Sequence, residues 1–363
     1  MSPSATFAPF LVTSRIRRLL GVALALMVIV TSALLATIPA EADSAAEARS
    51  ASFTISGSGW GHGWGMSQYG AYGAARKGLS WKQILAFYYR GTQLSVMPAG
   101  TRIKVWITAD SDSSLRVLPA NGLTVSDTAG HHYTVPTGPA FKSWRITRRG
   151  TGYRLSYRTT SGSYVTKSTG LSTGTWSFST RSKIVRVVLP NGSVRSYRGS
   201  VALIKRRSGG RTINRVLLED YVKGVVPAEM PTSWAAGAVR AQAVAARSYA
   251  VRLRDFGGYT GYDICDTTAC QVYGGMSRET TDGNAAVRAT AGKIVTYRGK
   301  VALTQFASSN GGLQRQGGLS LSRRPSRPLR RSDQVSGMDS GDQRTQHWWS
   351  LAVGRDSEAV ADH

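Results

Sequence analysis

Between residues 101 and 200, hydrophobic and polar positions alternate over short runs that are rich in branched and aromatic side chains. A repeat of two residues places successive side chains on opposite faces of a strand, so this pattern is typical of strands with one buried face. Asn-Gly pairs at 121–122 and 191–192 suit the tight turns that join antiparallel strands. We therefore expect a β-rich region over residues 101–200.

A different spacing begins after residue 233. Between about 234 and 254, hydrophobic residues recur every three or four positions, and these are Val239, Ala243, Ala246, Ala250 and Leu253. This spacing predicts a helix with one buried face. Thr232 or Ser233 is suited to cap its first turn.

The remaining segments complete a mixed organisation. Residues 53–100 are glycine-dense and then take helical spacing over 81–89, whereas 201–312 mixes strand and helix patterns. Residues 313–363 are rich in arginine and serine with little periodicity, so we expect a disordered tail there. We expect an α+β fold in which 53–100 packs on a core domain over 201–312, with the β-rich region as an insert.

The N-terminus has the parts of an export signal. An almost wholly apolar stretch, 19–38, follows three basic residues, Arg15, Arg17 and Arg18. Ala40-Glu41-Ala42 then has the small-x-small form of a cleavage site. Because the apolar stretch is near the roughly 20 residues that cross a bilayer, residues 1–42 are either a cleaved signal peptide or a membrane anchor, followed by a linker over 43–52. Both readings predict a secreted or cell-wall-associated protein that meets a membrane through this segment alone.

The overall charge is strongly positive. The chain carries 46 Lys and Arg against 20 Asp and Glu, a net charge of +26. Such a charge concentrates polyanions at the surface. The sequence has no zinc-finger spacing, RNA-binding aromatic signature or basic zipper, and export argues against nucleic acid. We expect anionic wall polymers as the polyanions, with a generally basic surface as the alternative.

Glu229 has the surroundings that best suit acid–base chemistry. Its neighbours over 225–228 and 230–231 are all apolar, and Pro227 and Pro231 are expected to keep the backbone extended. Removal of water disfavours an ionised carboxyl group and raises its pKa, which suits a general acid near neutral pH. The alternative is a carboxylate that caps the following helix or pairs with an arginine.

The number of carboxylates at the site distinguishes two ways of cutting a glycan. Hydrolysis of a glycan generally uses two carboxylates at a set separation, whereas a lytic transglycosylase needs one. Side chains that could supply a second carboxylate are Glu219, Asp220, Asp263 and Asp266.

The two cysteines, Cys265 and Cys270, could form a disulfide in an exported protein. Zinc is the alternative, but zinc sites usually need three or four ligands, and His131 and His132 are far away in sequence. We expect no metal and no cofactor. Near the second cysteine, Gln271 and Tyr273 could bind sugar hydroxyls or occupy core or turn positions.

Three further residues are candidates for substrate binding. Arg247 follows Glu229 by 18 residues on the predicted helix, where it could orient substrate or support negative charge, or form an ion pair. His62 and Gln68 lie in the segment GHGWGMSQYGA, whose glycines allow close backbone approach to a ligand.

The runs VLLEDYVKGVVPAEMPTSWAAGAVRAQAVAARSYAVR and YDICDTTACQVYGG closely resemble the stage II sporulation protein D (SpoIID)/LytB family over roughly residues 201–312. That family includes lytic transglycosylases that act on glycan strands stripped of stem peptides, and modifiers that enhance a wall amidase. The resemblance implies an exported peptidoglycan lytic transglycosylase with Glu229 as its single acid and base, or a non-catalytic wall-binding modifier. It places the family's cleft arginine on Arg247 and a Ser/Thr position on Ser248.

The glycine-rich run GHGWGMSQYGAYGAARKG resembles a segment that closes the domain at its C-terminal end in the sporulation proteins. Here the segment comes first, a permuted order that resembles actinobacterial-type members, and this implies that His62 and Gln68 pack near Glu229. After Gly312 the resemblance ends, which a divergent tail or a shifted reading frame would each explain.

Overall fold

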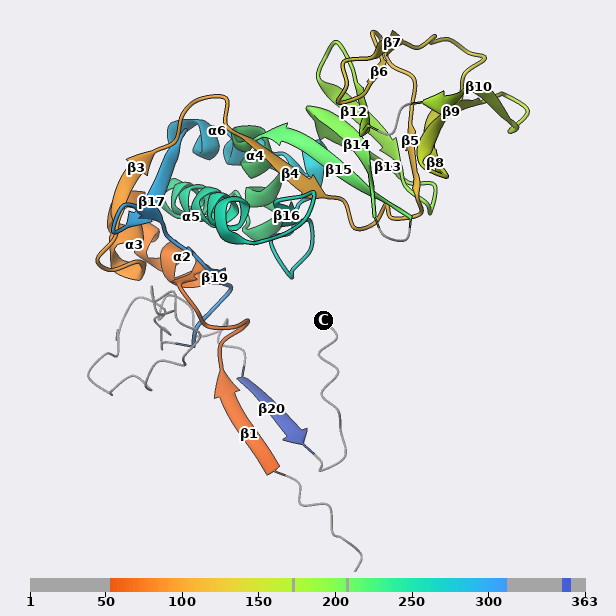
Figure 1. Cartoon of the computed structure of the whole chain (residues 1–363). Coiled ribbons are helices and arrows are strands. Elements are labelled where there is room, and N and C mark those ends of the chain that lie inside the picture. Colours follow the sequence, from red (N-terminus) through yellow and green to blue (C-terminus); the bar gives the residue numbers. More distant parts are fainter. Residues whose placement is uncertain (1–52, 172–173, 207–208, 312–347, 354–363) are drawn as a thin grey trace, which may run out of the picture. The chain divides into compact units, whose positions relative to one another are not determined.

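Figure 1 shows a computed structural model of the chain, which describes residues 53–171, 174–206, 209–311 and 348–353. The chain divides into a large unit, Ser56–Trp349, and a small one made of Met1–Ile55 with Ser350–His363. The predicted signal segment and linker, and most of the predicted tail, lie outside the described residues. In the described part, no helix is both long and apolar enough to span a bilayer.

Two paired strands contain residues of both units. Strand β1 (Phe53–Ser58) and strand β20 (Trp348–Val353) form a two-stranded sheet. β20 lies in the region that we expected to be disordered, so the structure differs from the sequence analysis at this point. Its sequence WWSLAV consists mainly of aromatic and aliphatic residues, which favour a strand when a partner strand is present.

Helix α5 (Ala236–Phe256) lies at the centre of the helical part of the large unit (Figure 1). Its most extensive contacts are with four helices and one strand, α2 (Gln68–Arg76), α3 (Trp81–Tyr88), α4 (Leu218–Glu229), α6 (Thr281–Ala289) and β17 (Lys293–Tyr297). Alanines make up much of its buried surface. Because the distance between packed elements depends on the side chains at the contact, these alanines let several neighbours surround one helix.

Helix α5 begins slightly later than its sequence pattern predicted. Ala235 is the N-cap residue, and no side chain caps the helix. Thr232, one of the two predicted caps, instead lies with its hydroxyl 2.9 Å from the hydroxyl of Thr280, the residue that caps α6. The N–H of Trp234 donates to the carbonyl of Pro231 (3.2 Å), so a turn precedes the helix.

The β-rich region forms two sheets. The first has the strand order β16 (Ile264–Cys265), β4 (Arg102–Trp106), β15 (Gly210–Leu217), β14 (Ser200–Lys205), β11 (Trp176–Ser179), β6 (Thr124–Ser126), β7 (His132–Thr134). The second has the order β10 (Tyr164–Leu171), β9 (Gly152–Arg158), β8 (Ser143–Arg149), β5 (Ser114–Val117), β12 (Ile184–Val188), β13 (Val194–Arg198). Contacts of β14 with β5 and β8, and of β11 with β12, show that the two sheets pack on each other.

The first sheet joins the β-rich region to the core. Strands β15 and β16 belong to the segment after residue 200, yet β15 pairs with both β4 and β14, and β16 pairs with β4 in parallel. The predicted boundary at residue 200 is therefore not a break between sheets. Together the sheets and helices confirm the mixed α+β fold.

The glycine-rich segment meets the end of the core domain. Strand β2 (Met66–Ser67) pairs in parallel with β19 (Phe306–Ala307), and β17 is flanked by β3 (Gln93–Val96) and β18 (Lys300–Val301). Gly65 has a φ of +71°, and a Cβ at this position would overlap the carbonyl group of Gln305. Here the close approach that glycine permits is between two segments of the chain.

Candidate functional site

Glu229 is the last residue of helix α4, and not part of the extended segment that the flanking prolines predicted. Pro227 lies inside the last turn of α4, where its missing N–H removes one helical hydrogen bond. The turn is nevertheless closed, because the N–H of Met230 donates to the carbonyl of Val226 (3.0 Å). The helix therefore fixes the backbone from which the Glu229 side chain extends.

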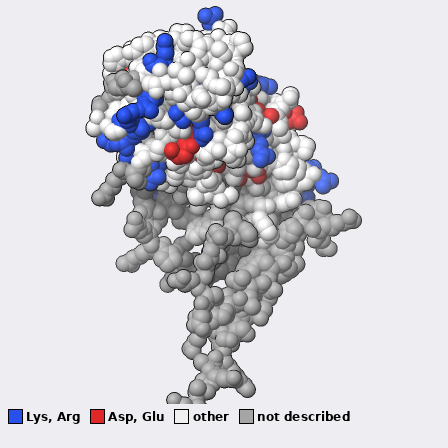
Figure 2. Space-filling view, turned by 90° about the vertical axis from the view of Figure 1, so that its right-hand side faces the viewer, with Lys and Arg blue, Asp and Glu red and all other residues white. Residues whose placement is uncertain are grey.

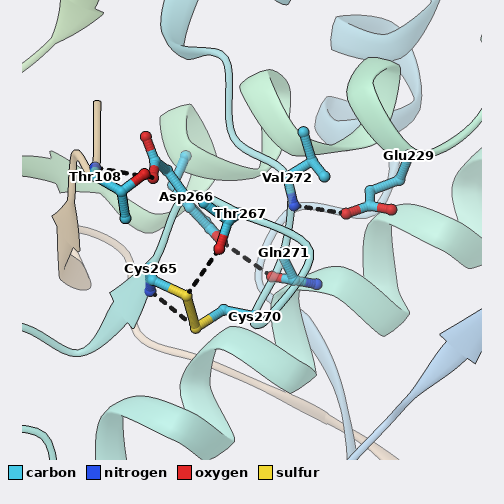
Figure 3. The surroundings of a disulfide bond; sticks show 9 residues. Thr108, Glu229, Cys265, Asp266, Thr267, Cys270, Gln271 and Val272 are labelled. Atoms are coloured by element: carbon cyan, nitrogen blue, oxygen red, sulfur yellow. Dashed lines mark hydrogen bonds between the residues drawn. A yellow bond between two sulfur atoms is a disulfide. The ribbon is translucent and has the colours of Figure 1, made fainter. Parts of the chain in front are cut away.

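The Glu229 carboxyl group is half-buried and accepts a backbone hydrogen bond. The N–H of Val272 donates to its Oε1 atom at 2.7 Å (Figure 3). Burial raises the pKa of Glu229, and the bond from Val272 offsets part of that rise because it favours the ionised form. The partial negative charge at the C-terminal end of a helix also disfavours an anion there. The raised pKa agrees with the sequence analysis, and among the described residues no cationic side chain forms an ion pair with Glu229.

A disulfide loop holds the residue that binds Glu229. Cys265 and Cys270 are joined by a disulfide, with their Cα atoms 5.5 Å apart (Figure 3). In the same loop, the carboxylate of Asp266 accepts hydrogen bonds from the N–H (3.0 Å) and the hydroxyl (2.7 Å) of Thr108. The loop is thus fastened to the residues after β4, and it ends at Val272 beside Glu229.

The zinc alternative needs more ligands than this loop offers. Both sulfur atoms are bonded to each other. The described segments contain no group of three or more His, Cys, Asp or Glu side chains that could hold a metal ion. His131 lies on the β-rich region with its Nδ1 atom 2.8 Å from Asp127.

The N-terminal segment reaches the Glu229 site through Gln68. The Nε2 atom of Gln68 donates to the backbone carbonyl of Glu229 (3.0 Å) and lies 3.4 Å from Oε1 of Gln242. Gln68 is the first residue of α2, whose N-cap Ser67 accepts a hydrogen bond from the N–H of Gly70. Although Gln68 and Glu229 are 161 positions apart in sequence, they are therefore in direct contact.

His62 does not share this placement. Its side chain is exposed, and its Nδ1 atom accepts a hydrogen bond from the N–H of Trp64 (3.0 Å). Partial burial lowers the pKa of His62. The recorded contact of this histidine is with its own segment and not with Glu229.

Two tyrosines near Glu229 were not singled out from the sequence. Burial is the main reason that the pKa values of Tyr221 and Tyr249 are raised, and the charge of Glu229 contributes to both. The hydroxyl of Tyr221 donates to Oε1 of Gln271 (3.0 Å). Tyr249 is half-buried. It follows Gln242 by seven residues on α5, and this helical spacing was the available signal that the two share one face of the helix.

Arg247 lies away from Glu229 and is fully buried, with 0% of its surface exposed. Its Nε and Nη2 atoms donate to the two carboxylate oxygens of Glu219, both at 2.8 Å, and its Nη1 atom donates to the carbonyl of Lys293 (3.0 Å). Glu219 is at the opposite end of α4, about 15 Å along the helix from Glu229. The structure therefore contradicts the cleft position implied for Arg247, because a bidentate ion pair already occupies its guanidinium group.

The other three candidates are core residues. The Ser248 hydroxyl donates to the carbonyl of Val244 (2.7 Å) and accepts from the N–H of Val295 (2.8 Å). The Tyr273 hydroxyl donates to Oδ1 of Asn214 (2.9 Å), and Gln271 is bound by Tyr221. Ser248, Gln271 and Tyr273 are all buried, and their side chains bind other buried groups of the core.

The possible second carboxylates are engaged elsewhere. Asp263 accepts a hydrogen bond from the N–H of Lys104 (2.8 Å), and Asp220 forms an ion pair with Lys223 (2.8 Å). Glu219 and Asp266 bind Arg247 and Thr108, as described above. Glu229 therefore differs from all four because, among the described residues, its carboxyl group has neither a cationic partner nor a side-chain donor.

Comparison with known proteins identifies the segment that carries this site. Residues 206–297 match the family model described as stage II sporulation protein (SpoIID). The amidase enhancer of Bacillus subtilis (strain 168) is 46% identical over 91 residues, which cover 25% of this chain and 12% of that protein. The stage II sporulation protein D of the same strain is 36% identical over 124 residues, 29% of this chain and 35% of that protein. Its Bacillus amyloliquefaciens counterpart is 34% identical over 121 residues, with the same coverage of 29% and 35%.

These matches cover part of each protein. The chain spans between 12% and 35% of the length of the curated relatives it matches. The matched segment contains helix α4 with Glu229, helix α5 and the disulfide loop. Residues 206–297 are therefore similar to the SpoIID family, which confirms the resemblance seen in the sequence.

Proposed function

We propose that this chain is an exported peptidoglycan lytic transglycosylase that uses Glu229 as its single acid and base. The observation that carries the proposal is the state of the Glu229 carboxyl group. It is half-buried, its pKa is raised, and one oxygen is held by the N–H of Val272. A carboxyl group in this state keeps its proton closer to neutral pH than an exposed glutamate does, and can give that proton to a bound substrate.

One carboxyl group is sufficient for the proposed reaction. Protonated Glu229 gives its proton to the glycosidic oxygen, and the bond from that oxygen to the anomeric carbon breaks. The resulting carboxylate then takes the proton of the C6 hydroxyl of the same sugar, whose oxygen bonds to the anomeric carbon and closes a 1,6-anhydro ring. The glycan is cut without water, and Glu229 ends in the protonated form in which it began.

The surrounding residues fit the two halves of this cycle. The N–H of Val272 stabilises the carboxylate that forms after the first proton transfer, while burial favours the acid form before it. Gln68 fixes the backbone of Glu229 through its carbonyl group. Tyr249, whose phenol is held neutral by its raised pKa, is a further donor for a sugar oxygen.

The likeness to proteins named stage II sporulation protein D and amidase enhancer supports a role at the cell wall. Residues 1–42 have the pattern of an export signal or anchor, which supports the same location. In this proposal, peptidoglycan glycan strands are the substrate, and no metal or cofactor takes part.

The test compares the purified protein with two variants on glycan strands stripped of stem peptides. Glu229→Gln is expected to lose about 10²- to 10⁴-fold in rate, the usual contribution of acid–base catalysis. Asp220→Asn removes another carboxylate of the same helix and is expected to keep the rate. Mass spectrometry identifies anhydro ends, because each is lighter by one water than a hydrolysed end. Anhydro products that persist at the same rate in Glu229→Gln would rule out this role for Glu229.

A second function is favoured by the 46% identity to a protein named amidase enhancer. In this alternative, the chain binds the wall and increases the activity of a wall amidase without cutting glycan itself. Amidase release of stem peptides, measured with and without the chain, distinguishes the two. Stimulation that is equal for the natural protein and Glu229→Gln, without any anhydro product, would favour the alternative.

A further inference from the structure

The outer face of the six-stranded sheet carries a row of arginines. Along β5, β8 and β9 the residues alternate between buried and solvent-facing, and the buried set packs toward the other sheet. The solvent-facing set on four neighbouring strands includes Arg116 on β5, Arg145 on β8, Arg154 and Arg158 on β9, and Arg186 on β12. We call these five residues the arginine face.

The arginine face brings like charges together. Arg116 lies directly opposite Arg145 in the pairing of β5 with β8, and Arg154 lies diagonally beyond it on β9. Like charges in opposite positions of a sheet are destabilising. The surrounding sequence does little to balance them, because residues 101–200 contain fifteen Lys and Arg but three Asp. Figure 2 views the molecule from the side on which β8, β9 and β10 lie, and most of the charged atoms visible there are blue.

Several contacts hold these side chains in place. The guanidinium carbon of Arg145 lies 3.4 Å from the ring centroid of Tyr164, and its Nε atom donates to the Ser156 hydroxyl (3.3 Å). Arg116 is bound at 2.6 Å to Asp112. The Nε atoms of Arg116 and Arg154 are shielded from solvent, and neither has a hydrogen-bond partner among the described residues. These donors lack the partners that shielded polar groups normally have.

We propose that the arginine face binds a linear poly(polyol phosphate), an anionic polymer of the cell wall. Neighbouring strands lie about 4.8 Å apart, so arginines on four strands form a row of about 14 Å, long enough to contact successive phosphates of an extended chain. The planar guanidinium group pairs with phosphate through two parallel hydrogen bonds, which explains why the row consists of arginine and not lysine. The choice of a wall polymer rests on the proposed cell-wall location, but not on the chemistry of Glu229.

In this arrangement the repulsion between neighbouring arginines lowers the stability of the sheet but favours the binding of a polyanion. The repulsion between Arg116 and Arg145 is present in the free protein and is relieved when a polyanion lies across the two strands. Removal of the arginines should therefore weaken binding without weakening the fold. If the arginines served only to stabilise the fold, their removal would lower stability and leave binding unchanged.

The test uses poly(glycerol phosphate) and double-stranded DNA of equal phosphate content as probes. The binding variant combines Arg116→Gln, Arg145→Gln and Arg154→Gln. The control variant removes three exposed charges from elements outside the β-rich region, Arg76→Gln, Arg288→Gln and Lys300→Gln. Affinity for each probe is measured as a function of salt, because each phosphate contact adds about one unit to the slope of log affinity against log salt.

The expected result is a slope for poly(glycerol phosphate) that falls by about 2 to 3 units in the binding variant and stays close to the natural value in the control. The melting temperature of the binding variant should equal or exceed that of the natural protein. Equal losses in the two variants would overturn the proposal, since a generally basic surface would then suffice. DNA that binds as tightly as poly(glycerol phosphate), with the same loss in the binding variant, would overturn the choice of a wall polymer.

The Glu229 proposal is tested separately in the same samples. The binding variant should cut stripped glycan strands at the natural rate, and Glu229→Gln should bind poly(glycerol phosphate) with the natural affinity. The cleavage rate therefore tests the Glu229 proposal and the affinity for poly(glycerol phosphate) tests the arginine face, so that either proposal can fail without the other.

Discussion

The two ends of helix α4 carry glutamates with opposite electrostatic surroundings. Glu219, in the first turn, binds the buried guanidinium group of Arg247 through both oxygens and also accepts the N–H of Gly292 (3.0 Å). Glu229, at the last position, is held by the N–H of Val272 and has no cationic partner among the described residues. The helix dipole adds to the difference, because it favours an anion in the first turn and disfavours one in the last.

The comparison distinguishes Glu219, whose carboxylate stabilises the fold, from Glu229, whose carboxyl group is the proposed acid and base. At Glu219 the negative charge is matched by the buried guanidinium group of Arg247. At Glu229 burial is not matched by a cation, and the raised pKa is the result. The same residue type on one helix is thus committed to the fold at one end and, in our proposal, transfers a proton at the other.

The largest expected effect comes from removing one partner of the Glu219–Arg247 pair. Glu219→Gln leaves a fully buried cation without its partner, and we expect a cost of about 3 to 5 kcal/mol in the free energy of unfolding. Arg247→Met should cost less, about 1 to 3 kcal/mol, because the Glu219 side chain is 35% exposed and can be solvated. Urea denaturation of the two variants and of the double variant measures the difference.

The double variant is the control for this prediction. Because it leaves neither charge unpaired, Glu219→Gln with Arg247→Met should be more stable than Glu219→Gln alone. If Arg247→Met kept full stability and lost glycan cleavage, Arg247 would belong to the reaction and the contrast between the two ends of α4 would fail.

The pH dependence of cleavage is the next largest effect. The first step of the proposed reaction needs protonated Glu229, whose pKa is raised by burial. Cleavage should therefore be lost as pH rises through this raised pKa, by about tenfold for each further pH unit. Initial rates over a pH series, with thermal melting to confirm that the fold persists, measure the position of this fall. A fall centred at the pKa of an ordinary exposed glutamate would contradict the buried state of the carboxyl group.

Asp110 extends the comparison to a carboxyl group that is almost completely buried, with 1% of its surface exposed. Burial, with a smaller contribution from Asp112, raises its pKa to about 7, although the Thr212 hydroxyl donates to its Oδ2 atom (2.8 Å) and lowers it. Since the folded pKa is above the unfolded value, the neutral form stabilises the fold at low pH. That contribution is lost as pH rises from about 4 to about 7.

We therefore expect Asp110→Asn, which stays neutral and can still accept from Thr212, to remove this loss. Its free energy of unfolding should exceed that of the natural protein by about 4 kcal/mol at about pH 8 and by almost nothing at about pH 4. Urea denaturation at the two pH values tests this. A difference in the free energy of unfolding that does not change with pH would contradict a raised pKa of Asp110.

The smallest expected effect concerns Gln68, which binds the backbone and not the carboxyl group of Glu229. Gln68→Ala should reduce stability by about 1 kcal/mol through one lost hydrogen bond. It should lower the cleavage rate only modestly and leave the pH at which activity falls unchanged. Gln68→Glu should not restore the lost hydrogen bond, because a carboxylate cannot donate. Gln68→Asn keeps a donor, but its side chain is shorter, so we do not expect it to restore the bond either. A change in the pH profile of Gln68→Ala would indicate direct contact with the reacting groups.

Local sequence predicted the environment of Glu229 but not the partner of Arg247. The apolar neighbours of Glu229 stay beside it whether the backbone is extended or helical, so the prediction of a raised pKa survived the wrong prediction of backbone shape. The partner of Arg247 depends on how α5 packs against α4, which no spacing along one helix reveals.

The fold shows the same limit. The stripe of alanines and valines on α5 and the alternation along the β-rich region were sufficient to predict their helices and strands. The sharing of one sheet by strands from both sides of residue 200 was not visible, because strand pairing over long distances leaves no local pattern. For Gln68, the family resemblance supplied the long-range information that spacing lacks, whereas Tyr249 was missed by both.

The pairing of β2 with β19 has a consequence for the order in which the domain can fold. Tyr89 donates its hydroxyl proton to the carbonyl of Gln305, 216 positions later, and Met66 donates its N–H to the same carbonyl (3.1 Å). Early in translation the glycine-rich segment therefore has nothing to pair with. Its partner, strand β19, is synthesised only after both sheets and helix α5. The glycine-rich segment, which is the first part of this domain to be synthesised, is therefore the last part that can take its final place in the fold.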